Sequence, residues 1–229
     1  MRIRRKKHLE DRLAAVSDFL YISDLDDRNF QTAVLEPDYL DLENWFGRQA
    51  PLYLEIGCGK GGFAAEFAKQ NPQVNVLGIE KSANVIVQAC ERAQREQISN
   101  LRFFKGGAEY LTKYLLPCSV ERIFLNFSCP FPKARYASHR LTHPKFLRLY
   151  SQVMTESAQI HQKTDNRQLF EFSIEALSGA GFTLKNISLD LHHSDFEGNI
   201  ETEYEKKFVA LGLPIYRLEA CRKNGEDHD

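Results

Sequence analysis

The sequence predicts an α/β fold in which a mostly parallel sheet carries helices on both faces. Two observations carry this prediction. The stretch Leu52–Gly62 has the pattern of a strand, a glycine-rich turn and the start of a helix. From Pro51 onward, strand and helix patterns alternate. A chain of 229 residues, 43% of them hydrophobic, can bury one sizeable core, so we expect residues 51–229 to form one domain.

Residues 1–50 are expected to be an N-terminal extension, because they are too few to bury a core of their own. Five of the first seven residues are basic. Such a run either solubilises a tail or contacts phosphates, and both interpretations stay open. A helix is expected from His8 to about Leu20, followed by an acidic link and a second helix near Pro37–Phe46.

The turn after the first strand contains four glycines within six residues, among them Gly57 and Gly59. Glycine lets the backbone turn sharply and approach a ligand. The pattern G-x-G-x-x-G also fits a dinucleotide site, but alone it is a weak match. Glu55, two residues before the first glycine, would repel a pyrophosphate and would favour the sulfonium and ammonium groups of S-adenosylmethionine. The stretch therefore favours S-adenosylmethionine over NAD.

The next elements extend the same α/β pattern. A strand over Val74–Glu80 ends in an acid that can bind the ribose hydroxyls of either cofactor. Ser82 can cap a helix that runs to about Gln97. A third strand over Leu101–Lys105 leads into a glycine pair and a short helix that contains Glu109.

A fourth strand over Glu121–Phe127 leads into the loop N-F-S-C-P-F-P-K, which ends at Lys133. Its two prolines do not suit a strand interior, so the segment is predicted to be a fixed loop at the carboxyl end of that strand. Ligands of open α/β sheets bind at this edge. We therefore expect the loop to face the glycine turn.

Between Arg122 and Thr155 the sequence has no acidic residue but six basic ones: Arg122, Lys133, Arg135, Arg140, Lys145 and Arg148. A solvated helix face usually mixes charges of both signs. A segment of one sign beside the expected ligand edge favours a polyanionic substrate, with Arg135 and Arg140 as phosphate contacts. The formal net charge of −1 conceals this local asymmetry.

The last third of the chain is expected to contain a strand over Gln159–Lys163, a helix over Arg167–Leu177 and a strand over Phe182–Leu191. Asp165 could simply cap the first of its helices. Thr202 and Glu205 have the spacing of a capping box at the start of a short helix. A final strand over Pro214–Ala220 would complete an antiparallel hairpin, as expected of S-adenosylmethionine-dependent transferases.

Composition excludes several other classes. Five cysteines form no C-x-x-C pair and are odd in number, so reduced thiols in a cytoplasm are expected and a zinc site is not. The sequence contains no secretory signal and no apolar run of membrane-spanning length, so no membrane partner is expected.

Six motifs in order give the chain a family resemblance: E-I-G-C-G-K-G, G-I-E, L-N-F-S-C-P-F-P-K, R-L-T, K-T-D-N-R-Q-L-F-E and T-E-Y-E-K-K-F. From about Leu52 to Tyr216 the sequence resembles the bacterial tRNA (guanine-N7-)-methyltransferases. The resemblance implies a Rossmann-like class I methyltransferase fold with a seven-stranded sheet and an antiparallel last strand. It also implies methyl transfer to a variable-loop guanine of tRNA (position 46), with S-adenosylhomocysteine as the product, by a monomer or weak homodimer.

The resemblance also assigns roles to residues. Glu55, Glu80 and the glycine turn would hold S-adenosylmethionine. The side chains expected to face the substrate guanosine are Lys133, Asp165, Thr202, Glu203, Tyr204 and Glu205. Two positions depart from the family pattern. Cys129 stands where the family has the aspartate regarded as catalytic, and Gly107 stands where it has an acid or amide; both positions are expected to contact the cofactor.

Three functions stay open. The first is a working, slower methyltransferase, because guanine N7 carries no proton to remove and the lost aspartate is one electrostatic contact among several. The second is a tRNA-binding relative with impaired catalysis. The third and weakest is a 5-methylcytosine RNA methyltransferase with Cys129 as nucleophile, because in that group proline precedes the cysteine, whereas here Pro130 follows it.

Overall fold

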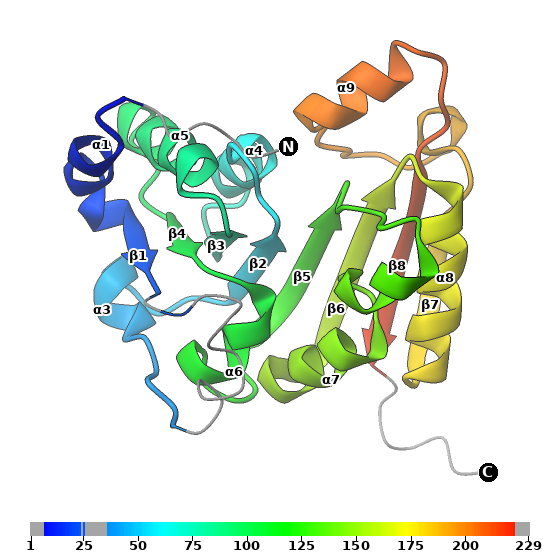
Figure 1. The fold of residues 1–229 in the computed structure, drawn as a ribbon, viewed down its shortest axis with the longest axis horizontal. Coiled ribbons are helices and arrows are strands. Elements are labelled where there is room, and N and C mark those ends of the chain that lie inside the picture. Colours follow the sequence, from blue (N-terminus) through cyan, green and yellow to red (C-terminus); the bar gives the residue numbers. More distant parts are fainter. Residues whose placement is uncertain (1–6, 24, 26–35, 223–229) are drawn as a thin grey trace. The chain divides into compact units, whose positions relative to one another are not determined.

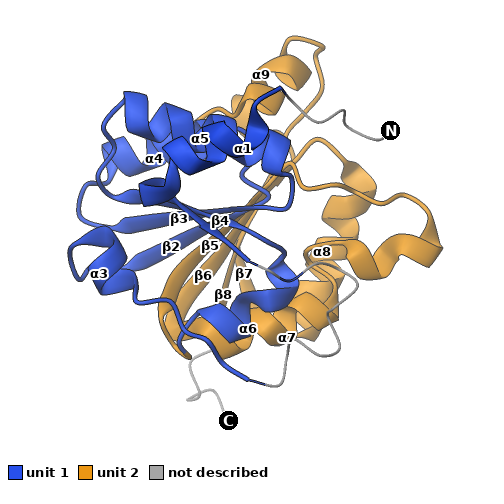
Figure 2. Cartoon of the chain, turned by 60° about the vertical axis from the view of Figure 1, so that its left-hand side comes forward, with its two compact units in different colours: residues 1–116 blue, residues 117–229 orange. Residues whose placement is uncertain are grey.

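The computed structural model describes residues 7–23, 25 and 36–222. The basic residues at positions 2, 4, 5 and 6 and the acidic link at 24–27 were both singled out in the sequence, and apart from residue 25 they lie outside the described residues. The chain divides into two compact units, Met1–Leu116 and Pro117–Asp229 (Figure 2). Each unit carries four of the eight strands in the described residues.

Unit 1 is a parallel α/β unit with the strand order β1-β4-β3-β2. Helices α4 and α5 cover one face of these strands and α6 lies on the other face (Figure 2). Its helices and strands are α1 Leu9–Ala15, β1 Leu20–Ile22, α3 Leu42–Phe46, β2 Leu52–Ile56, α4 Gly62–Gln70, β3 Asn75–Glu80, α5 Ala83–Arg95, β4 Leu101–Lys105 and α6 Leu111–Tyr114, with 3-10 turns η1 Ser17–Phe19 and η2 Ala108–Tyr110.

The core of unit 1 lies between the strands and α4 and α5. Leu54, Ile79 and Phe103 come from three neighbouring strands and are almost completely buried. Each of these strands is a short run of mainly buried residues between turn-forming residues, which explains why the sequence located β2, β3 and β4 within one residue at each end.

The N-terminal extension departs from the prediction. The helix expected to reach Leu20 ends at Ala15, and Leu20–Ile22 instead forms strand β1 beside β4. The ring of Tyr21 stacks on that of Phe104 with centroids 5.7 Å apart. Tertiary packing thus overrides the local helical pattern. This strand is why the described chain has eight strands and not the expected seven.

The second helix of the extension is also shorter than predicted, because α3 begins only after Asp41. The Asp41 side chain accepts a hydrogen bond from the Asn44 N–H and so caps the helix. The guanidinium of Arg102 on β4 lies over the rings of Phe19 and Phe46, at 5.1 and 5.2 Å from their centroids. The described part of the extension is therefore packed into unit 1, while the boundary at residue 50 between the extension and the domain stays a prediction.

Unit 2 has the strand order β5-β6-β8-β7 (Figure 1). Strands β5 and β6 are parallel, and β8 is antiparallel to both β6 and β7, which confirms the antiparallel last strand. Its helices and strands are β5 Val120–Asn126, α7 Pro144–Val153, β6 Met154–Thr164, α8 Arg167–Gly179, β7 Phe182–Ser188, α9 Glu203–Val209 and β8 Tyr216–Arg222, with 3-10 turns η3 Ala134–His139 and η4 Leu191–His193.

Helix α7 was not predicted as an element, since its segment was interpreted only through its charge. Pro144 occupies its first turn and the His143 side chain accepts a hydrogen bond from the Lys145 N–H. Phe146 and Tyr150 point into the core, where α7 packs beside α8 and against β6. The periodicity of these apolar residues is the signal that could have located the helix.

Candidate active site

In unit 1 the glycine turn lies at the carboxyl end of β2. Gly57 and Gly59 have φ angles of +79° and +58°, and among the described residues no atom lies within 4 Å of where their Cβ atoms would be. A Cβ on Gly61, by contrast, would lie 2.7 Å from that of Ala89 on α5. Gly61 therefore allows close helix packing, whereas Gly57 and Gly59 leave an exposed, sharply turned backbone beside open space.

Glu55 is buried on β2, with 3% of its surface exposed. Its Oε2 accepts a hydrogen bond of 3.1 Å from the Ala64 N–H in the first turn of α4. The positive end of the helix dipole stabilises a carboxylate there. Burial, together with the charges of Glu55 and Glu80, raises the pKa of the neighbouring Cys58 well above its usual value. The Cys58 thiol is consequently protonated and inert.

Glu80 is half-buried at the end of β3, and its Oε1 accepts a hydrogen bond of 2.8 Å from the Ser82 N–H. The N–H groups of Gly57 and Cys58 both donate to the Ile79 carbonyl, at 2.8 and 3.0 Å. The structure thus brings Glu80 and the glycine turn together at one sheet edge. Ser82 does precede α5 as predicted, but its side chain makes no capping hydrogen bond.

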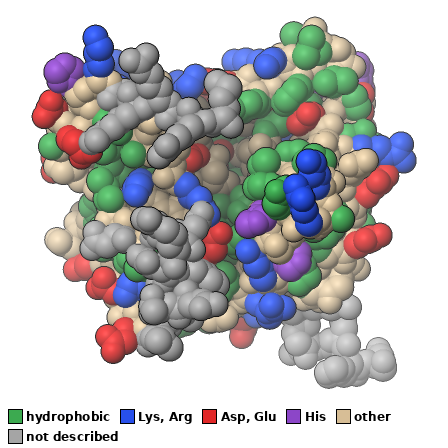
Figure 3. Space-filling view, viewed as in Figure 1, with side chains coloured by type: hydrophobic (Ala, Val, Ile, Leu, Met, Phe, Trp, Pro, Cys, Tyr) green, Lys and Arg blue, Asp and Glu red, His purple; other side chains and the backbone are tan. Residues whose placement is uncertain are grey.

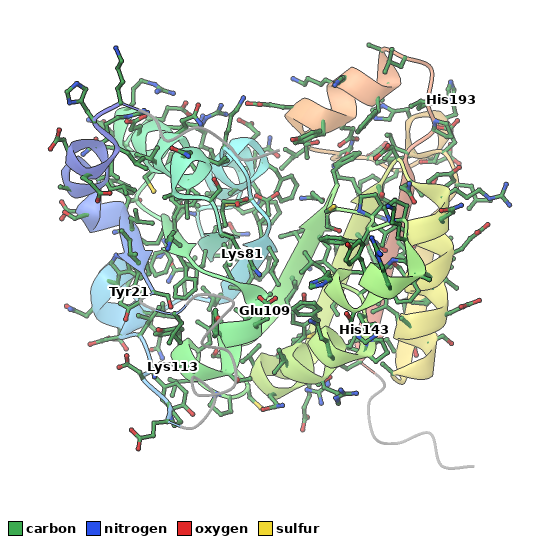
Figure 4. The ribbon with its side chains drawn as sticks, in the orientation of Figure 1. Tyr21, Lys81, Glu109, Lys113, His143 and His193 are labelled. Carbon is green, nitrogen blue, oxygen red and sulfur yellow. The ribbon has the colours of Figure 1, made fainter. Side chains whose placement is uncertain are left out.

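Gly107 follows β4 at the same edge, and the Gly106 N–H donates to the Glu80 carbonyl at 3.1 Å. The position of a Cβ on Gly107 is occupied by Oε2 of Glu109, with Cε of Lys81 2.8 Å away. Lys81 Nζ donates to Glu109 Oε1 at 3.1 Å, and Figure 4 shows the two side chains close together. Oε2 of Glu109 is buried and has no hydrogen-bond partner among the described residues. The direction of Glu109, which the sequence could not give, is toward Gly107.

In unit 2 the segment 127–133, hereafter the Cys129 loop, follows β5. Phe127 and Phe131 both have positive φ angles, +49° and +41°, which cost about 1–3 kcal/mol each for residues other than glycine. The Phe127 N–H donates to the Lys163 carbonyl at 2.8 Å. The side chains of Cys129 and Lys133 are exposed. The loop is thus fixed and presents both predicted residues to solvent.

Asp165 lies directly after β6 and is not the cap of α8. That role belongs to Asn166, whose Oδ1 accepts a hydrogen bond of 2.8 Å from the Leu169 N–H. The simple capping interpretation of Asp165 is therefore wrong. Asp165 is a half-buried carboxyl group at the carboxyl end of a strand, where ligands of α/β folds bind.

The four residues Thr202–Glu205 divide into two pairs. Thr202 and Glu205 are buried and form the predicted capping box at the start of α9. The side chains of Glu203 and Tyr204 are exposed, and the Tyr204 ring stacks on Phe208 with centroids 6.4 Å apart. The capping pair holds the helix, and the exposed pair can meet a ligand.

Sequence reasoning missed Lys163, which ties this helix to β6. Its buried Nζ donates to Glu205 Oε2 at 2.6 Å, to Asn199 Oδ1 at 2.9 Å and to the Ile200 carbonyl at 2.8 Å. Burial alone would raise the pKa of Glu205, but the charge and hydrogen bond of Lys163, assisted by Asn199, lower it. Strand β6 reads M-T-E-S-A-Q-I-H-Q-K-T, which is too polar for its pattern to mark Lys163 as buried, so the sequence carries no clear signal for this contact.

The basic segment of unit 2 is less uniform than its sequence. Lys133, Arg135 and Arg148 are exposed, whereas Arg140 is half-buried. On the face that Figure 3 shows, Lys, Arg and His side chains of unit 2 gather together. Part of the segment is thus available to a polyanion.

Solved structures share the fold. The A1408 methyltransferase of the 30S ribosome from an uncultured bacterium is 16% identical, covering 82% of this chain and 95% of that one with a TM-score of 0.56. The 16S rRNA methyltransferase KamB is 14% identical, covering 88% and 96% with a TM-score of 0.58. The chain therefore has the fold of the class I methyltransferases that depend on S-adenosylmethionine.

A family model described as "Putative methyltransferase" matches residues 49–218. The tRNA (guanine-N(7)-)-methyltransferase of Halalkalibacterium halodurans is 48% identical, covering 81% of this chain and 86% of that protein. The enzyme of the same name from Bacillus cytotoxicus is 41% identical, covering 96% of each. The chain belongs to the tRNA (guanine-N(7)-)-methyltransferase family.

Proposed function

We propose that the protein transfers a methyl group from S-adenosylmethionine to N7 of the variable-loop guanine of tRNA (position 46), with S-adenosylhomocysteine as the second product. The observation that carries the proposal is 41–48% identity to enzymes of that name over 81–96% of the chain. The acid-ended strands of unit 1 and the exposed polar groups of unit 2 support it.

The residues of unit 1 fit S-adenosylmethionine, which supplies an electrophilic methyl group on a cationic sulfur. Glu80 is placed to accept hydrogen bonds from the ribose hydroxyls. Gly57 and Gly59 offer an open backbone that no side chain obstructs. Glu55 places a negative charge beside the turn, and this charge attracts the cationic sulfonium and ammonium groups of the cofactor.

Glu109 takes over the role of the acid or amide that the family carries at position 107. Its carboxylate already occupies the place of a side chain on Gly107, and its buried Oε2 lacks a hydrogen-bond donor among the described residues. The Glu109 side chain keeps 14% of its surface exposed, and there an exocyclic amino group, such as that of the adenine ring, can donate to the carboxylate. A side chain larger than glycine at position 107 would then collide with the carboxylate of Glu109.

Chemistry at the guanine requires little of the protein. N7 has a lone pair and no proton, so methyl transfer needs alignment and exclusion of water more than a general base. The purine becomes cationic as the sulfur becomes neutral, and nearby carboxylates stabilise that positive charge. Asp165 and Glu203 are two solvent-accessible acids of unit 2, and either can accept hydrogen bonds from the N1–H and amino group of guanine.

Thr202 and Glu205 were also predicted to face the guanosine, and their part in binding is indirect in this proposal. They build the turn that presents Glu203 and Tyr204. Tyr204 supplies an exposed aromatic ring on which a base can stack. Lys133 supplies a cationic group that faces the guanosine, and Arg135 supplies one for a tRNA phosphate.

The partner is tRNA, and we propose a cytoplasmic protein that acts as a monomer or weak homodimer. In the part of the chain that the structure describes, no helix is long and apolar enough to cross a membrane. No cluster of three or more His, Cys, Asp or Glu side chains that could hold a metal is found among those residues either.

The test is to incubate the protein with S-adenosylmethionine and bulk tRNA that lacks the modification, then to digest the tRNA and identify its nucleosides. We expect 7-methylguanosine. The absence of any methylated nucleoside would favour the impaired tRNA-binding protein, an alternative that Cys129 at the aspartate position keeps open. A yield of 5-methylcytidine would show a cysteine-dependent enzyme instead.

A further inference from the structure

The Cys129 loop holds a conformation that its own sequence does not favour. Phe127 and Phe131 are both in the left-handed region, and neither is glycine. Such residues persist only where the surrounding structure fixes them. Contacts from elsewhere in unit 2 must therefore hold the loop.

Arg140 provides contacts at the second of these residues. Its Nε donates to the Pro130 carbonyl and its Nη2 to the Phe131 carbonyl, each at 3.1 Å. These two carbonyls directly follow Cys129 in the chain. The guanidinium also lies 4.5 Å from the centre of the Phe172 ring on α8. The side chain thus connects the loop to a helix of the unit's core.

Only an arginine fits this arrangement. A planar guanidinium donates two hydrogen bonds in fixed directions while its face stacks on a ring, and a lysine ammonium does not combine these contacts. Arg135, only five residues earlier, is exposed and its guanidinium lies 4.8 Å from the centre of the neighbouring Tyr136 ring. Both arginines are cationic, but Arg140 is half-buried against the loop whereas Arg135 is exposed to solvent.

We infer that Arg140 is a positioning residue, which holds the Cys129 loop in its active conformation, and that it is not one of the phosphate contacts. This departs from the role expected from the one-sign charge of the segment. The inference concerns the site of the proposed methyl transfer and rests on that function only for its kinetic consequence. The structural consequence can be measured without any substrate.

The first experiment compares backbone amide hydrogen exchange in wild type, Arg140→Lys, Arg140→Ala and Arg135→Ala. We expect the Phe127 amide, whose N–H donates to the Lys163 carbonyl and is a hydrogen-bonded amide of the Cys129 loop, to exchange about tenfold faster or more in both Arg140 variants, with wild-type protection in β5 and β6. Arg135→Ala should leave exchange in the loop unchanged. Wild-type exchange in the loop of both Arg140 variants would overturn the inference.

The second experiment measures methyl transfer to tRNA at several salt concentrations. Arg140→Lys should lower kcat about tenfold or more, because the two hydrogen bonds of the guanidinium to the loop carbonyls are lost. The KM for tRNA and its salt dependence should stay as in wild type, because the positive charge remains. Arg135→Ala should instead raise KM and lower the slope of log affinity against log salt by about one. An Arg140→Lys variant with wild-type kcat, together with a reduced slope in Arg140→Ala, would show a phosphate contact and contradict the inference.

Should the wild type make no 7-methylguanosine, the proposed function fails, and hydrogen exchange still decides the role of Arg140.

Discussion

Cys129 is one of the two residues that depart from the sequence pattern expected of the family. Its side chain is exposed on a loop whose backbone is fixed on both sides, by Phe127 on β6 and by Arg140 after the loop. A carboxylate in that place would face solvent without a burial penalty. An aspartate at position 129 would therefore add a negative charge to the loop.

Replacing Cys129 by aspartate should accordingly raise the rate of methyl transfer. Restoring one preorganised electrostatic contact is worth up to roughly 3–4 kcal/mol, so we expect kcat to increase by about tenfold or more. Cys129→Ser is the matched control and should change kcat less than about threefold, because neither side chain carries a formal charge. A slower Cys129→Asp enzyme would mean that the loop serves another purpose, and an inactive Cys129→Ser enzyme would point to a nucleophilic thiol.

Gly107 offers a second prediction at the same scale, on cofactor affinity. In calorimetric titration with S-adenosylhomocysteine, Gly107→Ala should bind about tenfold more weakly, because the added methyl displaces Glu109 from its place beside Lys81. In a Glu109→Ala background, which itself binds weakly, the same substitution should have little further effect. Additive losses in the double variant would contradict the proposal that the two residues share one space.

At the scale of elements, the buried pair Lys163–Glu205 joins α9 to β6 and ties the exposed residues of α9 to unit 2. A buried pair of this kind is strongly destabilising to break, by roughly 3–5 kcal/mol, because the remaining charge is left without its partner. The helix that presents Glu203 and Tyr204 is therefore anchored to β6 by a buried ion pair.

The pH dependence of stability tests this pair. The pKa of Glu205 is lowered in the folded state, so its stabilising contribution is full above the usual glutamate pKa of about 4.3 and is lost as pH falls through the lowered value. The free energy of unfolding of Glu205→Gln should thus lie roughly 3 kcal/mol below wild type at pH 7, and the gap should narrow below about pH 4. Urea denaturation across this range measures it. The exposed Glu203→Gln is the control and should shift stability by less than about 0.5 kcal/mol. A gap that stays constant from pH 7 to pH 3 would contradict the assignment.

Elements were predictable where the local pattern agrees with the tertiary environment. The boundaries of β2 and β4 and the capping box of Thr202 and Glu205 followed from the sequence, because short runs of mainly buried residues between turn-forming residues and capping chemistry leave a local pattern. Strand β1 could not be predicted in this way. Its three residues become a strand only through pairing with β4 and the stacking of Tyr21 on Phe104.

The residues of the candidate active site also divide into those that the sequence located and those that it did not. Glu80, the glycine turn and Asp165 were placed at strand ends by pattern alone, whereas the direction of Glu109 and the buried position of Lys163 depend on packing that no local pattern contains. Charge was the least reliable guide. Arg135 and Arg140 look alike in sequence, and only the hydrogen bonds of Arg140 to two loop carbonyls separate them.

At the scale of the whole molecule, the chain forms a parallel unit with an acid-ended glycine turn and a second unit with an antiparallel last strand. The two units carry different parts of one reaction in the proposed function, the methyl donor in unit 1 and the tRNA in unit 2. Most chemical specificity then rests on the substrate atom itself, because guanine N7 is nucleophilic without a base to activate it.

Transfer of a radioactive methyl group from S-adenosylmethionine to two tRNA transcripts tests this claim most directly. One transcript contains ordinary guanine, and the other contains 7-deazaguanine, which has carbon in place of N7 and keeps the N1–H and amino group. We predict incorporation into the first transcript and none into the second, although both should bind with similar affinity. Equal incorporation into both would show that the methyl group goes to another atom and would contradict the account.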